Sequence, residues 1–166
     1  QLHTKIAKAL ETDFADKLSH EPEIAAQHYT AAGLMQQAVP YWLAAGQAAI
    51  AKSANEEAIN HLTTGLECLY ALPENPQREE QELLLRATLG VSQFTARGYA
   101  APELGDNYEK ALAIVRRIGD TPFKSPAMFG VWAYHLLRVN YDRATEVANE
   151  ALEQAKERAE EASQAK

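Results

Sequence analysis

Residues Tyr41–Leu66, YWLAAGQAAIAKSANEEAINHLTTGL, decide the fold because they contain two amphipathic helices joined by a short turn. In the first half, apolar or small residues recur at i, i+3, i+4 and i+7 and form one stripe of Trp42, Ala45, Gly46 and Ala49. The second half carries its own stripe of Ala58, Leu62 and Gly65. Small residues allow the two helices to approach closely, and Trp42 fills the space between them. Such a hairpin cannot bury its apolar faces alone, so the pattern predicts that the unit repeats.

The turn between the two stripes is short and partly polar. Ser53 or Asn55 is predicted to cap the second helix, because both side chains can accept hydrogen bonds from the unpaired backbone N–H groups of its first turn. Glu56 and Glu57 then lie in that first turn, where carboxylates favour the helix dipole.

The chain overlays itself after a shift of 33 residues, which is the difference between positions 58 and 25. Ala25–Thr30 falls on Ala58–Thr63, and Asn107–Ala111 falls on Asn140–Ala144 with every charge sign kept. A period of this length is typical of stacked helical hairpins.

The repeat resembles the tetratricopeptide repeat. Trp42 and Gly46 stand where that pattern has its tryptophan and glycine, and Tyr108 and Tyr141 match the aromatic residue that opens the second helix. The small packing residue is matched by Ala25, Ala58, Ala111 and Ala144, each followed four positions later by Tyr29, Leu62, Val115 and Ala148. The resemblance implies an all-α, right-handed solenoid of about eight helices, with one repeat domain over residues 1–166.

Pairing the helices sets the phase of the repeat. First helices are predicted to begin near Leu2, Met35, Glu79 and Ser125, and second helices near Pro22, Asn55, Leu104 and Tyr141, with a polar break at residues 16–21. The step from Ala58 to Ala111 exceeds one period, so the middle repeat carries an insertion. The opposite phase, which pairs Tyr29 with Trp42, also fits the pattern.

Composition narrows the classes of partner. Apolar residues make up 46% of the 166 residues, which favours a folded domain over disorder. The net charge of −7 argues against nucleic acid or a membrane surface as the main partner. A single cysteine, Cys68, excludes an internal disulfide and suits a reducing, cytoplasmic location. Both ends fall within helical patterns, so we expect a fragment of a longer protein.

Several stretches resemble a more specific family. They are Leu2-His3-x2-Ile6-Ala7, His28-Tyr29-x2-Ala32-Gly33, Pro40-Tyr41-Trp42-Leu43 and Gly98-Tyr99-Ala100-Ala101-Pro102-Glu103. They look like the helical-repeat region of large bacterial signalling ATPases, in which a class III adenylate or guanylate cyclase domain, or a kinase domain, often precedes the ATPase. The resemblance implies a sensor or scaffold segment, with the cyclase and the ATPase outside these residues.

The sequence carries none of three common catalytic signatures. It contains no phosphate-binding G-x-x-x-x-G-K-[ST], no G-x-S-x-G and no H-E-x-x-H. Cys68 is predicted to be a buried structural thiol, and Glu57 with His61 supplies at most half of a metal site. We therefore expect no catalytic residue, no metal and no cofactor, and we expect that the chain is not an enzyme.

The residues predicted to bind a partner lie on the first helices, beside the packing stripe. Two sets at i, i+4 and i+7 are candidates for a partly apolar groove: Leu43, Gln47 and Ile50, and Phe129, Ala133 and Leu136. The alternative is that neighbouring repeats cover them. Trp42 and Trp132 are predicted to pack in the core, the alternative being a ligand-stacking role.

The sequence as a whole favours a protein–protein interaction or regulatory scaffold module. Its expected partner is a protein, a peptide or another domain of the same chain. The alternative function is a small-molecule effector sensor that relays to an ATPase or cyclase. Nothing in the sequence sets the oligomeric state.

Overall fold

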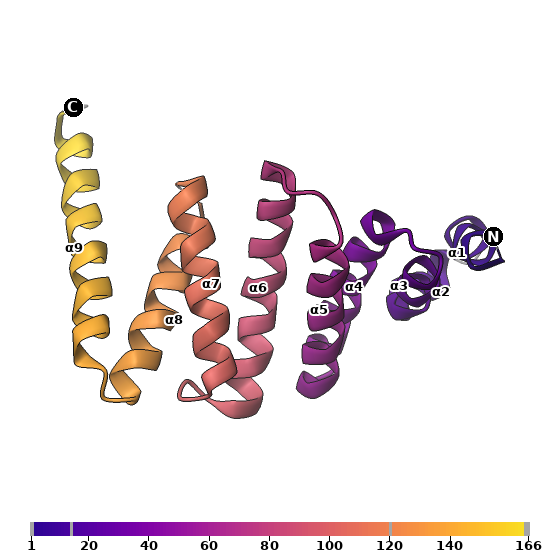
Figure 1. The fold of residues 1–166 in the computed structure, drawn as a ribbon, viewed down its shortest axis with the longest axis horizontal. Coiled ribbons are helices and arrows are strands. Elements are labelled where there is room, and N and C mark those ends of the chain that lie inside the picture. The colour runs from indigo at the N-terminus through magenta and orange to yellow at the C-terminus, as the bar shows by residue number, and fades with distance from the viewer. Residues whose placement is uncertain (1, 14, 120, 165–166) are drawn as a thin grey trace. The chain divides into compact units, whose positions relative to one another are not determined.

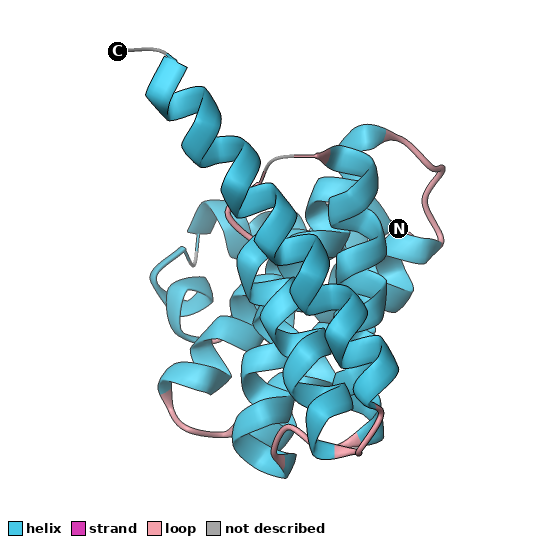
Figure 2. Ribbon diagram, turned by 90° about the vertical axis from the view of Figure 1, so that its left-hand side faces the viewer, coloured by secondary structure: helices cyan, strands magenta, loops and turns pink. Residues whose placement is uncertain are grey.

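The computed structural model describes residues 2–13, 15–119 and 121–164, and every regular element in them is a helix (Figures 1 and 2). The elements are α1 (Leu2–Asp13), α2 (Ala15–His20), α3 (Pro22–Ala31), α4 (Met35–Ala51), α5 (Asn55–Tyr70), α6 (Pro76–Arg97), α7 (Pro102–Ile118), α8 (Lys124–Leu137) and α9 (Tyr141–Gln164). The all-α class is confirmed. The polar break predicted at residues 16–21 is wrong, because α2 occupies most of it.

The chain divides into two compact units, Gln1–Ala96 and Arg97–Lys166. The first contains α1 to α6 and the second contains α7 to α9. Within the first unit, α4 packs against both α3 and α5. Both the predicted pairing of α4 with α5 and the opposite pairing of α3 with α4 therefore correspond to a helical hairpin. The single repeat domain over residues 1–166 stays a prediction.

The α4–α5 hairpin is the centre of the first unit. A Cβ placed on Gly46 would lie 2.5 Å from Cγ of Leu62, so only glycine permits this approach of the two helices. Trp42 is buried beside them, with 6% of its surface exposed. Its indole N–H donates to Oγ1 of Thr30 on α3 at 3.0 Å. The small stripe of α4 therefore serves close packing, as the sequence predicted.

The turn after α4 is built differently from the prediction. Ser53 has φ +58, in the left-handed region, and its N–H donates to the carbonyl of Ile50 at 2.8 Å. The N–H of Ala54 donates to the carbonyl of Ala49 at 2.9 Å, which completes a Schellman closure of α4. Ala54 is the N-cap of α5 and no side chain caps it, so the capping role predicted for Ser53 or Asn55 is wrong.

The same turn closes α8. Val139 has φ +62, and the N–H of Asn140 donates to the carbonyl of His135 at 2.9 Å. The shift from Ser53 to Val139 is 86 residues, the difference of the two positions, and it also superposes the last residue of α4 on that of α8. The first residues of α5 and α9 match under it as well. The α4–α5 and α8–α9 hairpins are therefore equivalent in their turns.

Val139→Gly is expected to raise the free energy of unfolding by about 0.5–1 kcal/mol. A left-handed conformation costs a residue with a Cβ about 1–2 kcal/mol, and glycine removes this cost. Part of the stabilisation is offset because glycine has greater conformational entropy in the unfolded chain. Val139 is 67% exposed, so little packing is lost. Urea melts of the two proteins measure the change. A loss of stability would contradict the left-handed turn.

Helices α7 and α8 of the second unit pack through two reciprocal glycine–tyrosine contacts. A Cβ on Gly105 would lie 2.3 Å from the ring of Tyr134, and a Cβ on Gly130 would lie 2.5 Å from the ring of Tyr108. Each helix thus offers a flat glycine surface to a tyrosine of the other. Tyr108 packs between helices as predicted, although the glycine that receives it was not foreseen.

The residues predicted to pack between repeats are mostly buried. Less than one-tenth of the surface is exposed in Ala25, Tyr29, Trp42, Gly46, Ala58, Leu62, Ala111 and Ala144. Tyr108 is half-buried. Tyr141 has 58% of its surface exposed, so its predicted packing role is wrong. Tyr141 is the first residue of α9, before the point at which Ala144 and Val147 turn toward the core.

Candidate functional site

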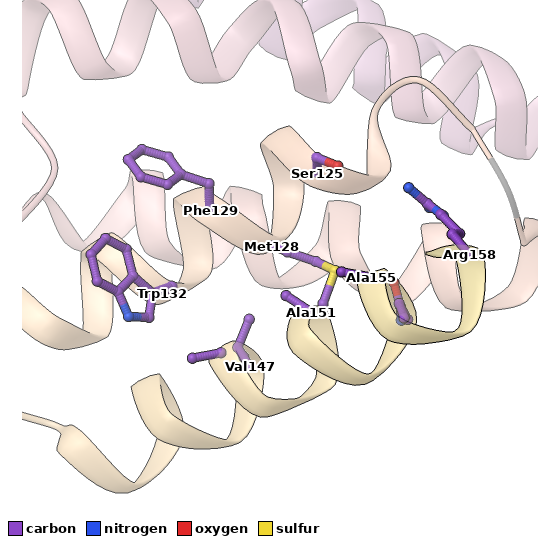
Figure 3. Close-up of a pocket in the computed structure, with 10 residues that line it drawn as sticks. Ser125, Met128, Phe129, Trp132, Val147, Ala151, Ala155 and Arg158 are labelled. Atoms are coloured by element: carbon purple, nitrogen blue, oxygen red, sulfur yellow. The ribbon is translucent and has the colours of Figure 1, made fainter. Parts of the chain in front are cut away.

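A groove of about 390 Å³ lies between α8 and α9 (Figure 3). Its lining is mainly apolar, and only three side chains in it carry a polar head group: Ser125, Gln154 and Arg158. The apolar lining consists of Met128, Phe129, Trp132, Val147, Ala148, Ala151 and Ala155. A volume of this size falls within the range of ligand sites in proteins.

The turn at Val139 and the unequal lengths of the two helices shape the groove. Helix α8 has 14 residues and α9 has 24, so α9 continues past the start of α8. Figure 3 shows the side chain of Met128 extending from α8 toward α9, near Ala151 and Ala155. Small alanines on α9 keep the groove open, because their side chains do not reach α8.

Aromatic rings form one edge of the groove. The rings of Phe129 and Trp132 have centroids 5.6 Å apart, and Tyr99 meets Phe129 edge to face at 5.9 Å. Phe129 is nevertheless 52% exposed. An exposed phenylalanine held in place by neighbouring rings is a rigid apolar contact surface, of the kind found at protein interfaces.

The groove residues predicted on α8 divide into two classes. Phe129 lines the groove, and Leu136 is 37% exposed, whereas Ala133 is buried with 6% exposed. Ala133 is therefore wrongly predicted to face a partner, because its side chain turns into the second unit. Trp132 was predicted to pack in the core, but it is only partly buried and lines the open groove.

The predicted groove residues on α4 are largely covered. Leu43 and Ile50 are half-buried and pack against the core of the first unit, and Gln47 is exposed. The alternative foreseen from the sequence, coverage by neighbouring helices, describes Leu43 and Ile50 better than an open groove does. Gln47 stays a candidate contact residue.

An ion-pair network joins the three helices of the second unit. Arg143 on α9 donates to the carboxylate of Glu109 on α7 through Nε at 3.0 Å and Nη2 at 2.7 Å. Nε2 of His135 on α8 contacts the same carboxylate at 2.9 Å. The hydrogen bond from Arg143 lowers the pKa of Glu109, with a smaller contribution from His135. A second pair, Arg116 with Glu150, joins α7 to α9. These contacts tie α9 to α7 and α8 beside the groove.

The chain is similar in sequence to a much longer bacterial protein. The chain is 32% identical over 125 residues to an uncharacterized protein of Rhizobium meliloti (strain 1021). The similarity covers 74% of this chain but only 12% of that protein's length. No family model matches the chain. No solved structure matches it either.

Glu109→Gln is expected to cost about 1 kcal/mol of stability, because it removes a charge-assisted, half-buried pair that solvent partly screens. The pKa of Glu109 is lowered in the folded state, so its contribution is complete above the ordinary value of 4.5 and disappears as the pH falls through the folded value. The difference between the two proteins should thus be largest near neutral pH and vanish in acid. Denaturant melts at several pH values measure it, and a difference that grew in acid would contradict the pairing.

The described residues carry neither a metal-binding cluster nor a helix suited to a bilayer. Glu57 and His61 approach to 3.4 Å, but the described residues contain no group of three acidic, histidine or cysteine side chains arranged to hold a metal ion. Within the described part of the chain, no helix combines the length and apolar character needed to cross a bilayer. Cys68 is buried and lies 3.5 Å from Oγ1 of Thr30.

Proposed function

We propose that this chain is a non-catalytic protein–protein interaction or regulatory scaffold module, built as a tetratricopeptide-like right-handed solenoid. The observation that carries the proposal is the open apolar groove on α8 and α9, edged by the exposed Phe129. The equivalent turns at Ser53 and Val139 support the repeat architecture. The resemblance to signalling ATPases favours a cytoplasmic parent protein with cyclase or ATPase domains.

The proposal is tested by affinity capture with the whole chain. A tagged chain, its Phe129→Asp variant and its Leu137→Asp variant are exposed to lysate of the source cells. Phe129 and Leu137 lie on the same helix and are 52% and 58% exposed, but only Phe129 lines the groove. A protein captured in stoichiometric amount and lost only with Phe129→Asp is the expected result. Failure of all three proteins to retain any partner above the tag alone would contradict it.

A Gln47→Ala variant extends the same test to the first unit. If Gln47 contacts the partner, its loss weakens capture while the fold is kept, since the side chain is exposed. Capture that is unchanged by both Gln47→Ala and Phe129→Asp would remove both candidate surfaces from the proposal.

A small-molecule effector sensor is the second candidate, and the groove volume favours it. Thermal shift with a metabolite collection tests this function, because a ligand at a hundred times its dissociation constant adds about 2.7 kcal/mol of stability. A shift that Trp132→Ala abolishes would support a sensor.

A further inference from the structure

The groove on α8 and α9 has a counterpart inside the first unit. The 86-residue shift that matches the two turns also carries groove-lining residues onto the α4–α5 hairpin. The corresponding pairs are Met128 with Trp42, Phe129 with Leu43, Ala148 with Leu62, Ala151 with Gly65, and Ala155 with Leu69. The same face of the same kind of hairpin is therefore present in both units.

In the first unit this face is covered by a helix. Cδ2 of Leu85 on α6 lies 3.1 Å from the position that a Cβ would take on Gly65. Leu85 and Leu89 are buried in one core cluster with Trp42 and Leu69. The leucines are four residues apart, so they lie on one face of α6 and enter the hairpin together.

In the second unit the corresponding residues line open space. Ala148, Ala151 and Ala155 are all exposed, whereas their counterparts Leu62, Gly65 and Leu69 are buried. At the positions of Leu62 and Leu69 the second unit carries only the methyl side chains of Ala148 and Ala155. Leu62 packs on Gly46, and the counterpart of Gly46 is the large Trp132, so the volume left for an occupant of the groove is mainly that of Leu69.

One position next to the groove-lining Ala155 differs in charge between the two hairpins. On α6, Glu82 precedes Leu85 by one turn and accepts a hydrogen bond from the hydroxyl of Tyr70 on α5 at 2.7 Å. The counterpart of Tyr70 on α9 is Lys156, which is exposed and lies 2.8 Å from Glu153. An ammonium group at this place attracts a carboxylate more strongly than a phenol does. Lys156, beside the groove, thus favours an acidic residue in the position of Glu82.

We propose that the α8–α9 groove binds a separate amphipathic helix that carries a Glu-x-x-Leu-x-x-x-Leu pattern, its leucines against Ala151 and its carboxylate near Lys156. This assignment rests on the proposed function as an interaction module and specifies the partner of that site. The helix runs antiparallel to α9, because α6 follows α5 through a short connection and packs back on it.

A synthetic peptide with the sequence of residues 76–97 is the probe, since it is the helix that fills the equivalent groove. Titrated with the whole chain, the fluorescently labelled peptide should bind with a dissociation constant on the order of 10–100 µM, because folding of the peptide offsets part of the contact energy. A peptide with Leu85→Asp and Leu89→Asp should not bind. Absence of saturable binding up to about 1 mM, or equal binding of the two peptides, would overturn the proposal.

Matched variants of the chain locate the site. Ala151→Glu places a carboxylate in the groove and should weaken binding at least about tenfold, since a charge would face the leucines. Asn149→Glu adds the same charge to exposed α9 outside the groove and should leave binding unchanged. Lys156→Glu should weaken binding about threefold, and a peptide with Glu82→Lys should recover it. Equal effects of Ala151→Glu and Asn149→Glu would overturn the proposal.

Sedimentation of the chain without peptide tests whether a second copy of the chain occupies the groove. A dimer that Ala151→Glu converts to monomer would assign the groove to a second copy and overturn the proposal of a separate helix. Failure of the peptide while affinity capture still recovers a partner would reject this inference and leave the interaction function standing.

Discussion

Trp42→Ala is expected to lower the free energy of unfolding by about 3–5 kcal/mol, the usual cost of removing a large aromatic side chain from a core. Trp42 is 6% exposed, and its Cβ lies 3.0 Å from the position that a Cβ would take on Gly65. Its ring centroid is 5.4 Å from that of His61. The cavity would thus open where α4 and α5 meet, and Thr30 would lose the indole N–H that it accepts at 3.0 Å.

The other tryptophan is the matched control for this prediction. Trp132 is partly buried and lines the open groove, so Trp132→Ala should cost about 1–2 kcal/mol. Urea melts followed by circular dichroism measure both variants under the same conditions. A loss below about 1 kcal/mol for Trp42→Ala would mean that Trp42 does not hold the α4–α5 hairpin together.

Gly46→Val is expected to destabilise the protein by about 2–3 kcal/mol. The new Cβ would lie 2.5 Å from Cγ of Leu62, and Leu62 is fully buried, so it has no space into which to move. Either α4 and α5 separate or Leu62 leaves its rotamer. Both responses open the core that α6 covers.

The control lies one residue away on the same helix. Gln47→Val introduces the same β-branched residue on the exposed face of α4. Only the helix propensity of position 47 changes, so the expected loss of stability is about 0.3 kcal/mol. Equal losses for the two variants in urea melts would show that Gly46 is not a close-packing site.

The helices and their packing stripes were predictable because an amphipathic helix records its buried face in its own periodicity. The stripe of Ala58, Leu62 and Gly65 is buried as its spacing required. The geometry of the turns was harder to predict from the sequence. Ser53 and Val139 both take a left-handed conformation that neither residue type favours, and only their equivalent positions relate them.

The candidate site was predictable only in part, because periodicity shows which residues share a face and not what lies opposite that face. Phe129 was correctly placed at an accessible surface, but Ala133 on the same predicted stripe is buried. Trp132 occupies the position of Gly46 and was predicted to pack in the core. It lines the groove instead, and the alanines of α9 that complete the groove gave no signal distinct from ordinary helix packing.

Photo-crosslinking from the groove tests the central claim, that α8 and α9 receive another polypeptide. The chain is produced with p-benzoylphenylalanine in place of Phe129 and, in a separate protein, in place of Leu137, the exposed residue outside the groove. Both are irradiated in lysate of the source cells, and the adducts are sequenced. The account predicts an adduct with a leucine-bearing helical segment of another polypeptide from position 129 and none from position 137. The same adducts from both positions, or none from either, would contradict it.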